Sequence, residues 1–237
     1  MSPDESRSDQ RGWWCVLGVN LFENLAAENL KVLSHYTQGF RYKKGETIYM
    51  PGDPATTVYF LKAGRMKLVY LDPSGRRFTV AICRPGQPFG ELGLSKEQSH
   101  YRFLAQALTD IELCSISKDS LLAFAGENPQ LSLRLAKWVG DQLNEIQIRL
   151  EELLFQDVPT RMARVLLRLA DEYGQTVPEG VLIDLPLTHQ ELAELIGSTR
   201  ETSSLTLSAL QREGFLVRQK RRFLLPDVAA LRARAQS

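Results

Sequence analysis

Four residues of one short segment carry the side chains with the clearest chemical use. Arg200 and Glu201 start a predicted helix, and Ser204 and Leu205 follow one turn later. The spacing i, i+1, i+4, i+5 puts all four on one helix face. A guanidinium that donates hydrogen bonds beside a carboxylate that accepts them, presented at the start of a helix, is typical of proteins that bind DNA in its grooves.

Two predicted helices position this face. Thr188 is followed three residues later by Glu191, and Ser198 by Glu201, so each pair has the spacing of a capping box. Gly197 lies between them, where a helix ends. Apolar or small residues on the inner side are Leu192, Leu195 and Ile196 in the first helix, and Ser203, Leu207 and Leu210 in the second. Two short helices around a glycine turn predict a helix-turn-helix.

Positive charge is concentrated just after this motif. The chain has 24% charged residues but a formal net charge of only +1, so any nucleic-acid contact must use local charge. The basic residues of the stretch are Arg212, Arg218, Lys220, Arg221 and Arg222, against one acid, Glu213. Such a run also occurs as a solvated surface, but its position beside the helix-turn-helix favours phosphate contacts.

Size and composition indicate one or two domains with sizeable cores, since the chain has 237 residues, of which 43% are hydrophobic. No apolar run approaches the ~20 residues that span a bilayer, and the polar N-terminus lacks a signal core. Cys15, Cys83 and Cys114 form no CxxC pair and no metal-ligand spacing. We therefore expect buried reduced thiols, no membrane contact and a cytoplasmic location.

Enzyme motifs are not evident. His35, His100 and His189 are scattered, and none accompanies a nucleophile motif, a glycine-rich phosphate loop or a metalloprotease signature. The sequence predicts no catalytic residues and no metal site.

The chain divides into four predicted parts. Residues 1–20 are a tail, polar and without periodicity to about residue 12, and 21–128 form a β-barrel or jelly roll. Residues 129–156 are one long helix, and 157–237 hold the helix-turn-helix. The expected strands of the barrel are Thr47–Tyr49, Val58–Lys62, Met66–Leu71, Phe78–Ile82, Phe103–Leu108 and Ile111–Ile116, with a hairpin turn at 73–75. The fold class is therefore α+β.

The long helix carries an apolar seam with steps of four and three residues. Its positions are Val139, Leu143, Ile146, Leu150 and Leu153. This heptad spacing favours a parallel homodimer contact over packing against the barrel. After it, Asp157 and Pro159 predict the start of another helix. We expect a loop at 176–180, a strand at 182–185, and a two-stranded wing formed by 215–217 and 223–225.

In sum, the chain resembles the Crp/Fnr family of bacterial transcription regulators from about residue 21 onward. The motifs that carry the resemblance are KGE at 44–46, PGD at 51–53, Gly64, PG at 85–86, FGELGL at 89–94, DV at 157–158, THQE at 188–191 and GSTRET at 197–202. The resemblance implies a cyclic-nucleotide-binding-type barrel, a dimerisation helix and a winged helix-turn-helix that binds double-stranded DNA and contacts RNA polymerase.

The resemblance also implies roles for individual residues. Arg200 and Glu201 match residues that meet base edges, where arginine pairs with guanine and glutamate with cytosine. Leu205 replaces a second arginine of the cyclic-AMP type, so it either touches a thymine methyl or packs under the wing. Candidate phosphate contacts are Thr188, Gln190 and Thr199, with Lys220, Arg221 and Arg222 in the wing.

The candidate effector pocket departs from the family pattern. Gly90, Glu91 and Leu92 match the segment that holds ribose and phosphate in cyclic-nucleotide binders. At family spacing the position of the phosphate arginine falls on Tyr101, and Arg102 follows one residue later. A slip of one residue in a strand turns the side chain to the other face, so Arg102 could serve only if the preceding loop shifts the register.

The polar pair that meets adenine corresponds to Ile146 and Gln147 in the long helix. Cyclic AMP therefore remains one candidate effector, and a regulator without an effector remains another. The alternative class, a ligand-sensing regulatory subunit without a DNA role, would lack the helix-turn-helix and the basic wing. The resemblance gives no clear match to the 2-oxoglutarate, iron–sulfur or haem types.

Overall fold

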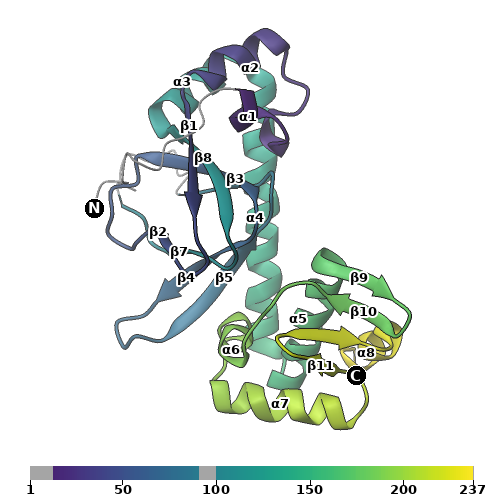
Figure 1. Cartoon of the computed structure of the whole chain (residues 1–237). Coiled ribbons are helices and arrows are strands. Elements are labelled where there is room, and N and C mark those ends of the chain that lie inside the picture. Colours follow the sequence, from purple (N-terminus) through teal and green to yellow (C-terminus); the bar gives the residue numbers. More distant parts are fainter. Residues whose placement is uncertain (1–12, 91–99, 237) are drawn as a thin grey trace. The chain divides into compact units, whose positions relative to one another are not determined.

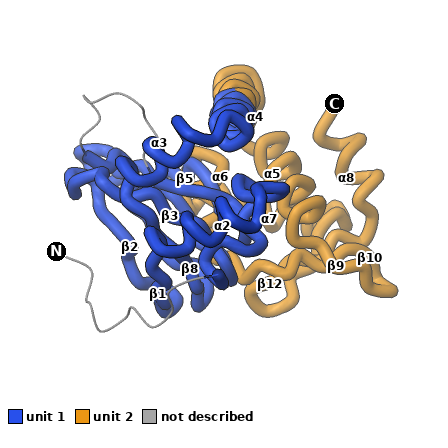
Figure 2. The backbone as a smooth tube through the Cα atoms, turned by 90° about the horizontal axis from the view of Figure 1, so that it is seen from above, with its two compact units in different colours: residues 1–143 blue, residues 144–237 orange. Residues whose placement is uncertain are grey.

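The structure, a computed structural model, describes residues 13–90 and 100–236. Contacts divide the chain into two compact units, residues 1–143 and 144–237, each of which is described by itself (Figure 2). The tail predicted for residues 1–12 lies outside the described residues. Residues 13–16 of that tail form a short helix. No helix of the described part is long and apolar enough to span a membrane.

Two antiparallel four-stranded sheets build the first unit (Figure 1). One sheet has the order β1-β8-β3-β6 and the other β2-β7-β4-β5. The strands are β1 (Thr37–Tyr42), β2 (Thr47–Tyr49), β3 (Thr57–Ala63), β4 (Met66–Leu71), β5 (Arg77–Cys83), β6 (Pro88–Phe89), β7 (Leu104–Ala107) and β8 (Ile111–Ser117). Both sheets contribute to one apolar core, which includes Phe40, Leu61, Met66 and Leu113. The predicted barrel is confirmed.

All six predicted strands are present, and two further strands were not predicted. β1 was missed because its sequence, TQGFRY, contains Gly39 and Arg41, yet its inward positions are buried and it pairs with β8 along its whole length. β6 has only two residues, Pro88 and Phe89, and is held by pairing with Tyr59 and Phe60 of β3.

A second core lies beneath the N-terminal helices. It joins α1 (Trp13–Val16), the 3-10 helix η2 (Asn20–Phe22), α2 (Ala27–Ser34), α3 (Lys118–Glu127) and the start of α4 (Pro129–Phe155). Here the expectation of reduced thiols is wrong for two cysteines, because Cys15 of α1 and Cys114 of β8 form a buried disulfide. A separation of 99 residues gave no local sign of this pairing. Cys83 lies buried in the barrel core and takes no part in the disulfide.

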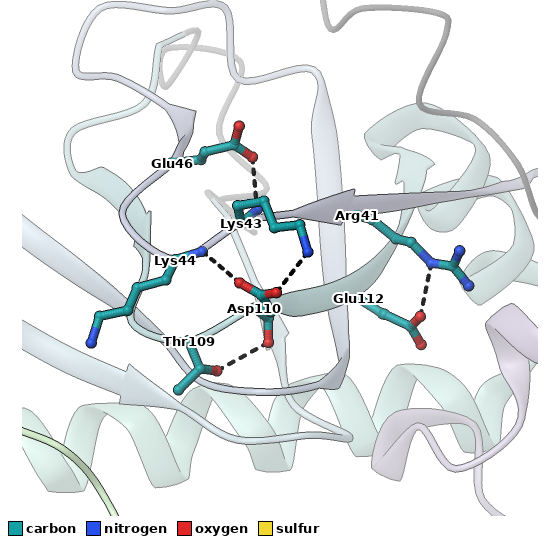
Figure 3. A network of polar contacts seen from close by, with 7 residues as sticks. All are labelled: Arg41, Lys43, Lys44, Glu46, Thr109, Asp110 and Glu112. Carbon is teal, nitrogen blue, oxygen red and sulfur yellow. Dashed lines mark hydrogen bonds and ion pairs between the residues drawn. The ribbon is translucent and has the colours of Figure 1, made fainter.

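A polar network ties three loops together at one end of the barrel (Figure 3). Asp110 accepts hydrogen bonds from the backbone N–H of Lys44, at 3.0 Å, and from the ammonium of Lys43, at 2.8 Å. The hydroxyl of Thr109 accepts one from the backbone N–H of Arg65. The contact with Lys43, chiefly its hydrogen bond, lowers the pKa of Asp110. The network fixes the β1–β2 loop and the turn after β3 against the β7–β8 turn.

The second unit contains the C-terminal half of α4 and a small α/β domain. Its elements are α5 (Val158–Tyr173), β9 (Gly174–Val177), β10 (Gly180–Ile183), α6 (His189–Ile196), α7 (Arg200–Arg212), β11 (Val217–Gln219), β12 (Arg222–Leu225) and α8 (Val228–Arg234). The predicted cap holds, since Asp157 accepts from the backbone N–H of Thr160. The buried stripe of α5 includes Met162, Val165, Leu166 and Leu169, as its spacing predicted.

The predicted loop at 176–180 is too long, and the strand predicted at 182–185 begins earlier, because only residues 178–179 form a turn. Residues 174–177 and 180–183 pair as antiparallel strands of a tight hairpin. The sheet continues through β12 to β11, in the order β11-β12-β10-β9, so the predicted two-stranded wing is confirmed as one edge of a four-stranded sheet. The loop assignment failed because this hairpin is polar on its exposed edge.

Candidate nucleic-acid interface

α6 and α7 form the predicted helix-turn-helix, with each end fixed by local hydrogen bonds. Thr188 caps α6 in a complete capping box with Glu191. Gly197 ends α6 in the left-handed conformation, at φ +62°. The second predicted box is wrong, because Thr199 rather than Ser198 caps α7, accepting from the backbone N–H of Thr202. The backbone N–H of Ser198 instead closes α6 on Ala193.

This one-residue shift leaves Glu201 in the first turn of α7, where the helix dipole favours a negative charge. Arg200 and Glu201 are both exposed. Leu205 is 73% exposed, so the alternative that packs it under the wing is wrong. Leu207 and Leu210, on the other side of the helix, are buried. Therefore α7 is anchored by one face and presents Arg200, Glu201 and Leu205 of the predicted face to solvent, whereas Ser204 is half-buried.

Ser203 lies on the anchored face and is fully buried. Its hydroxyl has no hydrogen-bond partner among the described residues. Removing an unsatisfied buried hydroxyl is neutral or stabilising, so we expect Ser203→Ala to raise the free energy of unfolding by up to about 1 kcal/mol. Thermal unfolding checks this, with Ser208→Ala as control, because the exposed Ser208 hydroxyl donates to the carbonyl of Ser204. A clear fall in Tm for Ser203→Ala would contradict it.

His189 links the two helices. Its Nδ1 lies 2.8 Å from the hydroxyl of Ser204, so the imidazole joins the first turn of α6 to the middle of α7. Burial lowers the pKa of His189, and the positive charges of Arg218 and Arg200 lower it further. His189 and Ser204 are 15 positions apart in the sequence, which gave no sign of this bond.

The lowered pKa predicts that stability depends on pH. In the unfolded state His189 takes up a proton below about pH 6.5, whereas in the folded state it takes up the proton only at a lower pH. The free energy of unfolding should therefore fall as the pH drops below about 6.5. Urea unfolding between pH 7.5 and 5.5 should show a smaller fall for His189→Gln than for the wild type. Identical falls in the two proteins would contradict the assignment.

The remaining DNA-facing candidates divide into two groups. The hydroxyls of Thr188 and Thr199 serve helix caps, and Gln190 is exposed at the start of α6. In the wing, Lys220 has a positive φ of 58° at the turn, and Lys220 and Arg221 are exposed. Arg222 differs, because it pairs with Asp184 at 2.8 Å, a contact that the sequence did not indicate. The backbone carbonyl of Arg221 accepts from Leu187, which ties the wing to the entry of α6.

Tyr101, to which the resemblance assigns the position of the phosphate arginine, belongs to a cluster of aromatic rings. Tyr101 is 4% exposed, stacks on Tyr49 with ring centroids 3.8 Å apart, and donates its hydroxyl to the carbonyl of Thr57. Tyr59 packs beside Tyr101, and burial, followed by the effect of Tyr101, raises the pKa of Tyr59 well above its usual range. Arg102 is exposed.

The other pocket candidates are not brought together in one described unit. Gly90 has φ +106°, and a Cβ there would meet the carbonyl of Thr57 at 3.2 Å. Glu91 and Leu92 lie outside the described residues. Ile146 and Gln147 belong to the second unit and are exposed.

The apolar seam of α4 faces solvent in the single chain. Its exposed fractions lie between 38% and 55%. The residues are Val139, Leu143, Ile146, Leu150 and Leu153.

Known proteins share both halves of this architecture. Residues 40–128 match the model of the cyclic nucleotide-binding domain, and 160–234 match that of the Crp-like helix-turn-helix domain. A global nitrogen regulator of Synechocystis is 35% identical over 80% of this chain and 85% of its own length. A cyclic AMP receptor protein of Thermus thermophilus is 32% identical over 83% of this chain and 88% of its own.

Solved structures agree. A CooA mutant from Carboxydothermus hydrogenoformans has a TM-score of 0.74 at 28% identity, covering 97% of both chains. The regulator CLP of Xanthomonas campestris, described as c-di-GMP responsive, has a TM-score of 0.76 at 25% identity, covering 84% of this chain and 99% of that one. With its barrel, long helix and exposed recognition helix, the chain belongs to the Crp/Fnr family of DNA-binding transcription regulators.

Proposed function

We propose that the chain acts as a homodimeric, sequence-specific regulator that binds a pseudo-palindromic promoter site and activates transcription. The observation that carries the proposal is the exposed face of α7. Arg200, Glu201 and Leu205 are exposed on a helix whose other face is held by buried Leu207 and Leu210. Such a helix enters a major groove without unpacking its own domain.

Each side chain of that face has a distinct partner in the groove. Arg200 donates two hydrogen bonds to guanine, and Glu201 accepts from cytosine N4. Leu205 has no polar group and contacts a thymine methyl. Phosphates are held by the wing residues Lys220 and Arg221. Further phosphate contacts come from Thr188, Gln190 and Thr199 at the starts of α6 and α7. Arg222 contributes less to phosphate binding, because it already pairs with Asp184.

The dimer uses the seam of α4. Five apolar side chains at heptad spacing stay about half exposed in the single chain, and a second copy in parallel register would bury them. Two-fold symmetry then separates the two recognition helices by one DNA turn, ~34 Å, which requires a pseudo-palindromic site.

The proposal does not require a cyclic nucleotide. A buried phosphate without a charged partner is costly, and Tyr101, to which the resemblance assigns the position of the phosphate arginine, is uncharged and buried. The alternative of a cyclic-AMP-responsive regulator is therefore disfavoured, as is a sensor without DNA, which would need neither recognition helix nor wing. Calorimetry with cyclic AMP tests this, and tight binding would restore the first alternative.

Activation would come from a surface contact with RNA polymerase in the cytoplasm, without catalysis by this chain. Two tight turns are the candidate contacts, the β4–β5 turn at 73–76 and the β9–β10 turn at 178–179. In the first, Asp72 accepts hydrogen bonds from Ser74 and Arg76, which fix the turn and lower the pKa of Asp72.

A gel-shift experiment with fragmented genomic DNA tests the main proposal. At moderate salt, repeated selection should enrich pseudo-palindromic fragments, while at low salt unrelated DNA should also bind. If the protein binds all fragments equally at moderate salt, sequence-specific binding is refuted.

Sedimentation tests the dimer separately. Leu143→Asp with Leu150→Asp places charges in the seam and should give a folded monomer, because buried unpaired carboxylates are costly. A matched variant, Asn144→Asp with Ile148→Asp, adds the same charge at exposed positions off the seam and should leave the dimer intact. If the seam variant sediments as the wild type does, the proposed dimer is wrong.

A further inference from the structure

A pocket of about 300 Å³ lies on the second unit, on the side of α5 that packs against α8. Glu152 of α4, Arg164 and Arg168 of α5, and Arg232 next to Asp171 line it. Its volume is at the lower end of the range for small-molecule sites, about 300–1,000 Å³. These residues all belong to one unit, and none is assigned to DNA contact by the proposed function.

The guanidinium groups in this pocket are only loosely paired. Arg168 lies 3.5 Å and Arg164 4.0 Å from the two oxygens of one carboxylate, that of Glu152, and Arg232 lies 3.4 Å from Asp171. Charge-assisted N–H···O bonds are normally about 2.7–2.9 Å long.

Other arginines of the same chain make closer pairs. Arg41 lies 2.8 Å from Glu112, and Arg222 lies 2.8 Å from Asp184. Arg234, which does not line the pocket, lies 3.7 Å from Glu213, so long pairs also occur elsewhere in the chain. What distinguishes the pocket is that three loosely paired arginines line it together.

Positive charge exceeds negative charge at the lining. Three arginines face two carboxylates, and one of these, Glu152, is 7% exposed and shared between two guanidiniums.

Spacing brings the arginines onto one surface. Arg164 and Arg168 are four residues apart on α5, so their side chains lie on the same helix face. Buried Leu167 and Ala235 form an apolar floor between α5 and the end of α8. A planar guanidinium presents up to five N–H donors in a fork that fits phosphate and carboxylate oxygens.

We propose that this pocket binds a compact polyanion that bears phosphate or carboxylate groups and is held by Arg164, Arg168 and Arg232. The bound anion supplies the oxygens that Glu152 and Asp171 supply only at long distance. Because the site draws on α4, α5 and α8, its occupant cross-links the end of the long helix to the domain that carries the recognition helix.

The test uses the full chain without DNA, so it does not depend on the proposed promoter binding. Inorganic pyrophosphate and citrate are titrated by calorimetry at constant ionic strength, and Tm is followed in parallel. We expect saturable binding and a rise of Tm for at least one of them. Tighter binding of pyrophosphate identifies a phosphate ligand, and tighter binding of citrate a carboxylate ligand.

Three variants locate the site. Arg164→Gln with Arg168→Gln should weaken binding by about tenfold or more, since two charged donors are lost. Arg232→Gln, at a more exposed position, should weaken it severalfold without affecting folding. Glu152→Gln should tighten it, because it removes the carboxylate that competes for the same guanidiniums. A purely structural role for these side chains predicts no such gain.

The matched control is Lys31→Gln with Lys137→Gln, which removes two positive charges from exposed positions of the first unit and should leave the affinity unchanged. Binding that is kept in the pocket variants would overturn the proposal, and so would binding that the control variant loses to the same extent. So would the absence of saturable binding of both anions to the wild type at millimolar concentration.

Discussion

Replacing Gly64 with alanine is expected to lower the stability of the N-terminal unit by more than about 3 kcal/mol, a loss seen only for substitutions with a specific steric or burial cause. Gly64 has φ +81°, where an L-residue costs roughly 1–2 kcal/mol. In addition, its Cβ would stand 2.2 Å from the backbone carbonyl oxygen of Asp110 and 2.9 Å from Ile111. The backbone of Asp110 cannot move away from the added Cβ, because Asp110 holds the loop network of Figure 3 together.

Gly45→Ala is the matched control. Gly45 has a similar φ of +87°, but nothing lies within 4 Å of its Cβ, so only the same conformational cost of roughly 1–2 kcal/mol applies. The three tryptophans, residues 13, 14 and 138, all belong to the first unit, so their fluorescence during urea unfolding reports on that unit alone. Equal losses for the two variants would show that the close approach at Gly64 relaxes without cost.

Local signals explain what the sequence could predict. The capping box at Thr188 and Glu191, the glycine that ends α6 and the cap at Asp157 each depend on a few adjacent residues, and the structure contains all three. The cap of α7 was placed one residue early because Ser198 and Thr199 are both good N-cap residues. Ser198 also has Glu201 three residues later, at the spacing of a capping box. The backbone bond from Ser198 to Ala193 decides between them, and it depends on how tightly the turn closes.

Contacts between distant segments explain what the sequence could not predict. Cys15 and Cys114 lie 99 residues apart, and their pairing follows from the packing of α1 beside the strands of the barrel. The pair of Arg222 with Asp184, and the bond between His189 and Ser204, likewise join separate elements. Leu205 had two possible environments in the sequence, and only the tertiary structure, which leaves it 73% exposed, chose between them.

Replacing Arg200 with alanine is expected to remove the preference for the guanine that it contacts in each half-site. One bidentate arginine–guanine pair contributes about 1–3 kcal/mol of discrimination. A symmetric dimer uses the pair twice, so about 2–6 kcal/mol is lost, which corresponds to roughly 30-fold to 10⁴-fold in specificity. The measurement compares Kd for the selected site with Kd for the same site carrying A·T at that position. The two values should converge for Arg200→Ala.

Lys220→Ala provides the contrast that separates base recognition from charge. Lys220 is exposed in the wing and has no groove-facing role in the proposal, so its loss should weaken both sites by the same factor. The slope of log K against log salt should become shallower by about 0.9 for each lost phosphate contact, or about 1.8 for the dimer. Arg200→Ala should change discrimination much more than Lys220→Ala does, because only the guanidinium in the groove distinguishes one base pair from another. If Arg200→Ala instead weakened the two sites equally, Arg200 would be a phosphate contact, and the polar face of α7 would not determine the sequence.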